Sequence, residues 1–177
     1  MKLELIDQRG RPQALPLPIE RLAALVAPLG APDWILDLVL VEDPVMADLY
    51  GRWYGGEGVT DVLSFSYLEP QGAGAPQLPA GHGEAAADLW VPPADAAGPV
   101  VAGEVILAPR FVDGRCAREG WDLAAEWALL LVHGALHVLG WTHDTEVQQV
   151  AMRACEARLL AAEGLGHPLA GGETEGS

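Results

Sequence analysis

The sequence is poor in basic residues and almost lacks lysine. Only ten of its 177 residues are Lys or Arg, against 25 Asp and Glu, so the formal net charge is −15. A protein that wraps duplex nucleic acid needs many basic phosphate contacts, and this balance argues against such binding and against DNA as a ligand. Net charge does not describe a pocket, so a local basic site stays compatible with this composition.

Cysteine and long uncharged apolar runs are also scarce. Cys116 and Cys155 are the two cysteines, and their spacing fits neither a metal site nor a redox motif. The window 123–141 is the most apolar, but Glu126 and two histidines within it are costly in hydrocarbon, which predicts a buried helix that carries a site. The first eleven residues lack the apolar stretch of a secretory signal. We therefore expect a cytoplasmic protein with no membrane span.

The apolar periodicity predicts four short strands and several helices. The predicted strands are Leu3–Ile6, Leu38–Val41, Val62–Tyr67 and Gly103–Ala108. The predicted helices cover 18–29 and 45–54, begin at Pro109, run from the N-cap Asp122 to Leu139, and span 146–163. Because strands come early and helices late, we expect an α+β fold with a small mixed sheet of about four strands and helices packed over it.

One domain is expected over residues 1–168. Residues 70–100 are rich in Gly, Ala and Pro, which predicts a long loop inserted into that domain. Residues 169–177 are small and acidic, which predicts a disordered tail.

Three of the five histidines, His133, His137 and His143, fall within eleven residues. The first two are four apart in a helical segment, so both rings leave one face, and Gly140 then turns the chain so that His143 can approach them. Three neutral imidazoles around one point favour a catalytic zinc site, one ion per chain, whose fourth position stays open for water or substrate. Other divalent transition metals could bind the same nitrogens. Gly134, in mid-helix, predicts a close backbone approach beside the metal.

The same histidine spacing occurs in metzincin peptidases, so a peptidase is one alternative. Their mechanism requires a glutamate directly after the first histidine as the general base for water, and this position is Gly134. Glu126 and Glu104 are the other candidates for a base, and nothing in the sequence places either at the metal.

Three motifs together resemble the YbeY family of bacterial single-strand endoribonucleases, which act in ribosomal RNA maturation. The segment from His133 to His143 reads His-Gly-Ala-Leu-His-Val-Leu-Gly-Trp-Thr-His, close to the family signature. Thr60–Phe65 matches the family's Thr-Asp-Val-Leu-Ser-Phe strand, and Gly103–Ile106 matches a Gly-Asp-Ile-like strand. The order and spacing agree from about residue 35 to residue 160.

This resemblance implies a metal-binding helix and turn that line a cleft against a four-stranded sheet. It implies a zinc-dependent endoribonuclease for 16S rRNA 3′ end processing and ribosome quality control, with the metal activating water or polarising the scissile phosphate. The implied substrate is single-stranded or ribosomal RNA, and ribosomal proteins or a ribosome-associated GTPase are implied as further partners. A catalytically weak zinc-containing ribosome assembly factor remains an alternative, in which Asp144 or His82 would supply a fourth ligand.

The predicted site residues follow from both lines of argument. The family usually has a Tyr-Arg pair before the Thr-Asp-Val-Leu-Ser-Phe strand, where this chain has Trp53 and Tyr54, and Arg52 is the nearest replacement for the arginine. Glu104 stands where the family has an aspartate. We therefore predict His133, Arg52 and Glu104 as catalytic. Trp53 and Tyr54 are expected to pack in the core, although either could stack on bases. The predicted substrate-binding residues are Arg110, Arg115, Arg118 and Trp141.

Overall fold

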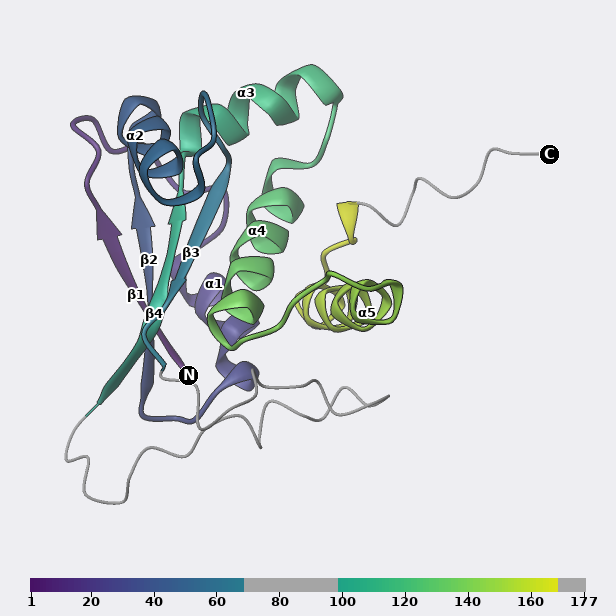
Figure 1. Ribbon diagram of the computed structural model, residues 1–177. Helices are drawn as coiled ribbons and strands as arrows, with labels where there is room; N and C mark the ends of the chain where they lie inside the picture. The colour runs from purple at the N-terminus through teal and green to yellow at the C-terminus, as the bar shows by residue number, and fades with distance from the viewer. Residues whose placement is uncertain (69–98, 169–177) are drawn as a thin grey trace.

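The computed structural model describes residues 1–68 and 99–168 (Figure 1). Its centre is a four-stranded sheet with the strand order β1-β2-β4-β3. The strands are β1 (Lys2–Asp7), β2 (Trp34–Leu40), β3 (Val62–Ser66) and β4 (Val100–Leu107). Strands β1, β2 and β4 are parallel, and β3 pairs antiparallel with β4 at one edge. The predicted α+β class and mixed four-stranded sheet are confirmed. The described residues do not include His82, the predicted tail at 169–177 or almost all of the predicted loop at 70–100.

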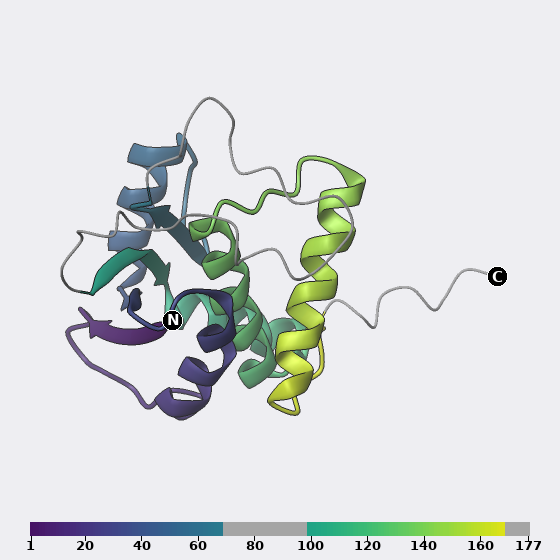
Figure 2. The same ribbon diagram turned by 90° about the horizontal axis from the view of Figure 1, so that it is seen from below.

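Helices cover both faces of this sheet, as Figures 1 and 2 show. They are α1 (Ile19–Val26), α2 (Asp43–Tyr54), α3 (Pro109–Glu119), α4 (Leu123–Val138) and α5 (Glu146–Ala162), and a 3-10 turn, Ala27–Leu29, follows α1. Successive side chains of a strand point to opposite faces. On β2, Leu38 therefore joins the main core under α1 and α4, whereas Val39 contributes to a smaller core with Met46 of α2. Helix α5 forms an outer layer against α1 and α4.

Helix α4 is the buried helix that positions the histidines. Its N-cap Asp122 accepts a hydrogen bond from the backbone N–H of Ala125 at 2.8 Å, as the sequence predicted. Nearly all of its side chains are buried between the sheet and α5. None of the helices in the two described ranges is long and apolar enough to cross a membrane.

Gly134 allows α4 to lie directly against the sheet. A Cβ atom at this position would lie 2.8 Å from Cγ1 of Val105 on β4, closer than van der Waals contact allows. The predicted close backbone approach is therefore present, and the element that Gly134 approaches is the sheet. The short distance between α4 and β4 brings the histidine face of the helix to the edge strand β3.

The turn after α4 reverses the chain. Gly140 has a φ of 86°, a left-handed conformation that glycine adopts without strain. Thr145 then begins α5 with a capping box, in which its side chain accepts from the N–H of Gln148 and the Gln148 side chain accepts from the N–H of Thr145. The segment between these two points carries His143 back toward α4.

Candidate metal centre

The three predicted histidines converge. His133 and His137 lie one turn apart on α4, and their ring centroids are 4.5 Å apart. The ring of His143 lies 5.5 Å from that of His133 and 5.0 Å from that of His137. One nitrogen from each ring lies within 4.8 Å of the other two, so the three could hold one ion.

Each helical histidine is oriented by a hydrogen bond on its outer nitrogen. Nδ1 of His133 lies 2.8 Å from Oε1 of Glu156 on α5. Nδ1 of His137 lies 2.8 Å from the main-chain oxygen of Trp141 in the turn. A carbonyl or an ionised carboxylate can only accept, so both Nδ1 atoms donate. In the neutral rings the Nε2 atoms then carry lone pairs.

These two Nε2 lone pairs face each other at 3.1 Å. Burial lowers the pKa of His137, and the neighbouring His133 lowers it further, which favours its neutral form. Two opposed lone pairs repel unless a cation lies between them. Tetrahedral zinc with Zn–N bonds of about 2.0–2.1 Å would hold two nitrogens roughly 3.3 Å apart, close to the observed separation. The donor set and its spacing therefore fit a metal ion.

No fourth protein ligand joins this group among the described residues. His133 and His137 are half-buried and His143 is exposed. Asp144, the neighbour of His143, is not part of the cluster. Structural zinc usually has four protein ligands, whereas catalytic zinc has three and an open position. The three histidines thus offer the number of protein ligands that is typical of catalytic zinc.

Glu156 links the metal centre to the C-terminal part of the described chain. Its side chain is 4% exposed, and its second oxygen, Oε2, lies 3.2 Å from Nε2 of His167. Burial by itself would raise the pKa of Glu156, but the hydrogen bonds with His133 and His167 outweigh burial and lower it. The carboxylate is thus ionised and accepts from both imidazoles. Carboxylates in this position orient metal-binding histidines and increase their basicity.

Two cavities meet at the histidines, and His133 and His143 line both. The first, of about 570 Å³, lies between α4, the turn after it, β3 and the end of α2, and His137 also lines it. The second, of about 470 Å³, lies between α4, α5 and the start of β3. The predicted cleft between the metal-binding helix and the sheet is therefore present.

Arg115 is the member of the predicted arginine cluster that reaches this site, in the second cavity. Its guanidinium forms ion pairs with Asp61, just before β3, and with the buried Glu126 of α4. It also lies over the ring of Trp121, with Cζ 5.2 Å from the ring centroid. Two carboxylates thus compensate one cation, and Arg115 ties β3 to α4 beside the histidines.

The other predicted cationic residues lie elsewhere. Arg110 lines a separate cavity with Arg9 and Arg11, near the ends of β1 and β2. Arg118 is exposed in the last turn of α3 and lines neither histidine cavity. Arg52 pairs with Asp48, four residues earlier on the surface of α2, at 2.8 Å.

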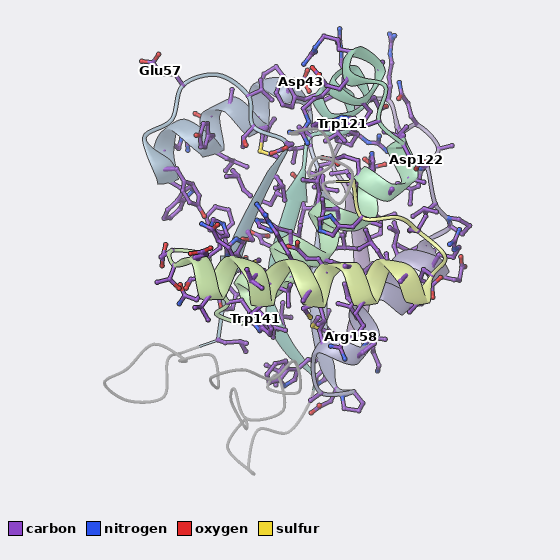
Figure 3. The ribbon with its side chains drawn as sticks, turned by 90° about the vertical axis from the view of Figure 1, so that its right-hand side faces the viewer. Asp43, Glu57, Trp121, Asp122, Trp141 and Arg158 are labelled. Carbon is purple, nitrogen blue, oxygen red and sulfur yellow. The ribbon has the colours of Figure 1, made fainter. Side chains whose placement is uncertain are left out.

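Glu104 lies away from the histidines, whereas Trp141 lies beside them. Val105 faces α4, so its neighbour Glu104 faces away from the histidines on the opposite side of the sheet. There, burial and a hydrogen bond to Glu104 raise the pKa of Tyr67 to about 12. The indole of Trp141 is buried in the core, on the other side of α5 from Trp121 in the view of Figure 3. The residue lines the first cavity, and its main-chain oxygen accepts from Nδ1 of His137.

These positions bear directly on the peptidase alternative. Gly134 offers no base, Glu126 is held by Arg115, and Glu104 points away. Glu156 binds the outer nitrogen of His133. In the described part of the chain, no carboxylate therefore takes the place of the metzincin glutamate.

Sequence reasoning missed three side chains of the site. Glu156 and Arg153 lie on α5, and Arg153 lines the second cavity. Asp61 was not among the predicted site residues, yet it holds Arg115. Tertiary packing of α5 and α3 brings these residues together, and their spacing in the sequence carries no signal. Trp53 and Tyr54 were expected in the core but are 68% and 56% exposed.

Comparison with known proteins agrees with this geometry. The family described as "Endoribonuclease YbeY" matches residues 20–164. A relative of that name from Mycolicibacterium smegmatis is 35% identical over 125 residues, which cover 71% of this chain and 61% of the relative. One from Nocardia farcinica is 37% identical over 125 residues, 71% of this chain and 59% of the relative. The matches thus span about three fifths of the length of these relatives.

A solved structure shares the fold. The solution structure of TM1509 from Thermotoga maritima superposes with a TM-score of 0.53, covers 91% of each chain and is 16% identical in sequence. The family match over most of the chain, the two sequence relatives and the histidine geometry lead to one conclusion. The chain belongs to the YbeY endoribonuclease family.

Proposed function

We propose that this protein is a metal-dependent endoribonuclease that cleaves single-stranded RNA. The observation that carries the proposal is the pair of opposed Nε2 atoms, 3.1 Å apart, on histidines that line an open cavity of about 570 Å³. The three nitrogens suit zinc, one ion per chain. When bound, such an ion lowers the pKa of water or polarises a phosphate oxygen.

The protein's own residues fix the ligand geometry. Glu156 and the main-chain oxygen of Trp141 hold His133 and His137 in the orientation that directs both Nε2 atoms to one point. His143 completes the set from the turn. Because the turn is fixed by Gly140 and the capping box of α5, little reorganisation is needed when the metal binds.

We infer that Arg153 is the residue best placed to contact a phosphate. It lines the second cavity together with His133 and His143, and no ion pair joins it to a carboxylate of the described residues. Arg115 lies in the same cavity, but Asp61 and Glu126 already compensate its charge. Arg115 therefore mainly shapes the cavity and contributes less to phosphate binding than Arg153 does.

The biological setting follows from the family. We propose action in ribosomal RNA maturation, at the 3′ end of 16S rRNA, and in ribosome quality control, which would place the protein in the cytoplasm. Ribosomal proteins or a ribosome-associated GTPase would be its protein partners. The acidic chain, with a net charge of −15, fits recruitment through such partners better than nonspecific RNA binding.

The test is a metal and cleavage assay on the purified chain. We expect about one zinc per chain, cleavage of single-stranded RNA that a chelator abolishes and zinc restores, and loss of cleavage in His137→Ala. His137→Ala is also the control for contaminating ribonuclease, and Val147→Ala, at a 75% exposed residue of α5, is the matched surface variant that should cleave as the wild type does. A substrate with a 2′-deoxy group at the cut site distinguishes attack by water from attack by the 2′-hydroxyl.

Two results would contradict this proposal. Stoichiometric zinc without any RNA cleavage would favour the ribosome assembly factor instead. Absence of bound metal under saturating zinc would remove the metal-dependent mechanism altogether.

A further inference from the structure

Two aromatic rings at the end of α2 are exposed to an unusual degree. The side chains of Trp53 and Tyr54 are 68% and 56% exposed, although tryptophan is on average a highly buried residue. Both contact Phe65 of β3, with ring centroids 5.7 Å and 6.2 Å from it. We call Trp53, Tyr54 and Phe65 the aromatic shelf.

The shelf is held in place before any ligand arrives. The hydroxyl of Tyr54 donates a hydrogen bond to the main-chain oxygen of Ser64 at 3.2 Å. Trp53 meets Phe65 edge to face, with an interplanar angle of 68°. Phe65 packs in turn on the small core under α2. Rings that are already ordered lose little side-chain entropy when a ligand stacks on them.

The shelf is continuous with the metal centre. Tyr54 lines the first cavity, which all three histidines also line. Phe65 pairs with Glu104 and therefore faces the opposite side of the sheet from α4. The rings thus lead from the cavity around the edge strand β3. A ligand that reaches both the shelf and the histidines must be extended and carry flat groups at intervals, as a single strand of RNA does.

Charge favours stacking as the source of affinity. Arg52, beside the shelf, pairs with Asp48, and Arg115, beside the histidines, pairs with Asp61 and Glu126. With a net charge of −15, the protein has few cations for phosphate contacts. Aromatic side chains bind bases without such contacts and tolerate every base, because every base has a flat face.

We propose that Trp53 and Tyr54 stack on RNA bases adjacent to the phosphate that lies at the histidines. This inference rests on the proposed function and identifies how the site selects its substrate. Bases of a duplex are already stacked on each other, so the shelf accepts single strands and excludes duplexes. Binding depends weakly on base identity and on salt.

The experiment measures binding of a fluorescent eight-nucleotide 2′-O-methyl RNA to the zinc-loaded protein by anisotropy. We expect Trp53→Ala to weaken binding about tenfold or more, because stacking accounts for a large part of the affinity of each base. Trp53→Phe keeps an aromatic face and should stay within about threefold of the wild type. Val45→Ala, on the same helix at a 45% exposed residue outside the shelf, is the matched control and should bind as the wild type does.

Two further readouts separate stacking from other roles. A plot of the logarithm of the RNA association constant against the logarithm of the salt concentration should have a slope of about −1 or shallower. Each phosphate neutralised on a single strand contributes roughly −0.7 to this slope. With a cleavable strand, Trp53→Ala should raise KM about tenfold and leave kcat within about twofold.

Binding is scored on the 2′-O-methyl strand, checked to be intact after the titration, and cleavage is scored separately on unmodified RNA. Unchanged binding by Trp53→Ala, or a slope steeper than about −3, overturns the shelf while the nuclease assignment stands. If the wild type forms a homodimer that Trp53→Ala dissociates while RNA binding is unchanged, the shelf is a dimer contact and the proposal is also overturned. If the wild type neither binds nor cleaves single-stranded RNA, the proposed function fails and the shelf with it.

Discussion

Replacement of Glu156 by glutamine tests whether the hydrogen-bond partner of His133 affects the affinity of the histidine site for zinc. The carboxylate accepts from Nδ1 of His133 at 2.8 Å and from Nε2 of His167 at 3.2 Å. A glutamine amide has one accepting oxygen, and its NH₂ group only donates. Glu156→Gln therefore cannot accept from both imidazoles, and one of them faces another donor.

The size of the effect follows from these contacts. A hydrogen bond to a charged group contributes about 1.5–3 kcal/mol, and the one that glutamine cannot accept is lost. The metal-free variant loses the same hydrogen bond, however, and only the difference between the metal-bound and free forms changes affinity. Outer hydrogen-bond partners of metal-binding histidines typically account for 10–100-fold, about 1.4–2.7 kcal/mol, and we expect a weakening of zinc binding in this range.

The measurement is competition for zinc between the protein and a chromophoric chelator. Leu159→Ala is the matched control, because Leu159 is 6% exposed on the same helix and its truncation removes core packing, a loss of about 2–5 kcal/mol in stability. It should lower the melting temperature and leave zinc affinity unchanged. Zinc affinity of Glu156→Gln within twofold of the wild type would refute the reasoning.

Three further predictions concern the same centre. His167→Leu should weaken zinc binding in the competition assay, whereas His167→Gln should largely preserve it, because Gln keeps a donor for Oε2 of Glu156. Equal zinc affinities of the two variants would contradict this. Gly134→Ala should destabilise the protein by about 1–3 kcal/mol, because its Cβ meets Val105, and this outweighs the better helix propensity of alanine. In thermal denaturation, adding Val105→Ala should recover part of the lost stability. Burial lowers the pKa of His137, so the unfolded chain takes up a proton below about pH 6.5 that the folded chain does not. The free energy of unfolding of the metal-free protein should therefore fall as the pH falls through that value, less steeply in His137→Gln, and a rise on acidification would show that the sign is wrong.

The fold was largely readable from the sequence because local signals were strong. Apolar runs ended by Gly or Pro marked the four strands, and the actual β2 and β4 only begin a few residues earlier than predicted. Asp122 marked the start of α4. Spacing of four residues on one helix, followed by a glycine turn, brings His133, His137 and His143 together through local geometry alone. The convergence of the three histidines was predictable for this reason.

The partners of these histidines depended on contacts between distant segments. Glu156 and His133 are 23 residues apart, and only the packing of α5 on α4 joins them. Arg115 and Arg110 lie five residues apart on α3, yet Arg115 reaches the histidine cavity and Arg110 reaches Arg9 and Arg11. Sequence proximity grouped these arginines, whereas the direction in which each leaves the helix separates them.

Contacts between distant segments also decide where the aromatic side chains lie. Side-chain type predicted burial for Trp53 and Tyr54, and the structure exposes both. Trp141, predicted to contact substrate, lines the histidine cavity although its side chain is buried. Whether a ring lies in the core or at the surface depends on which face of α2 or of the turn packs on the sheet. The sequence by itself thus determined the elements and the grouping of the three histidines, because periodicity and turns act over a few residues. Tertiary structure alone decided the hydrogen-bond partners of the histidines, the cavities and the aromatic shelf, because these form where segments far apart in the chain meet.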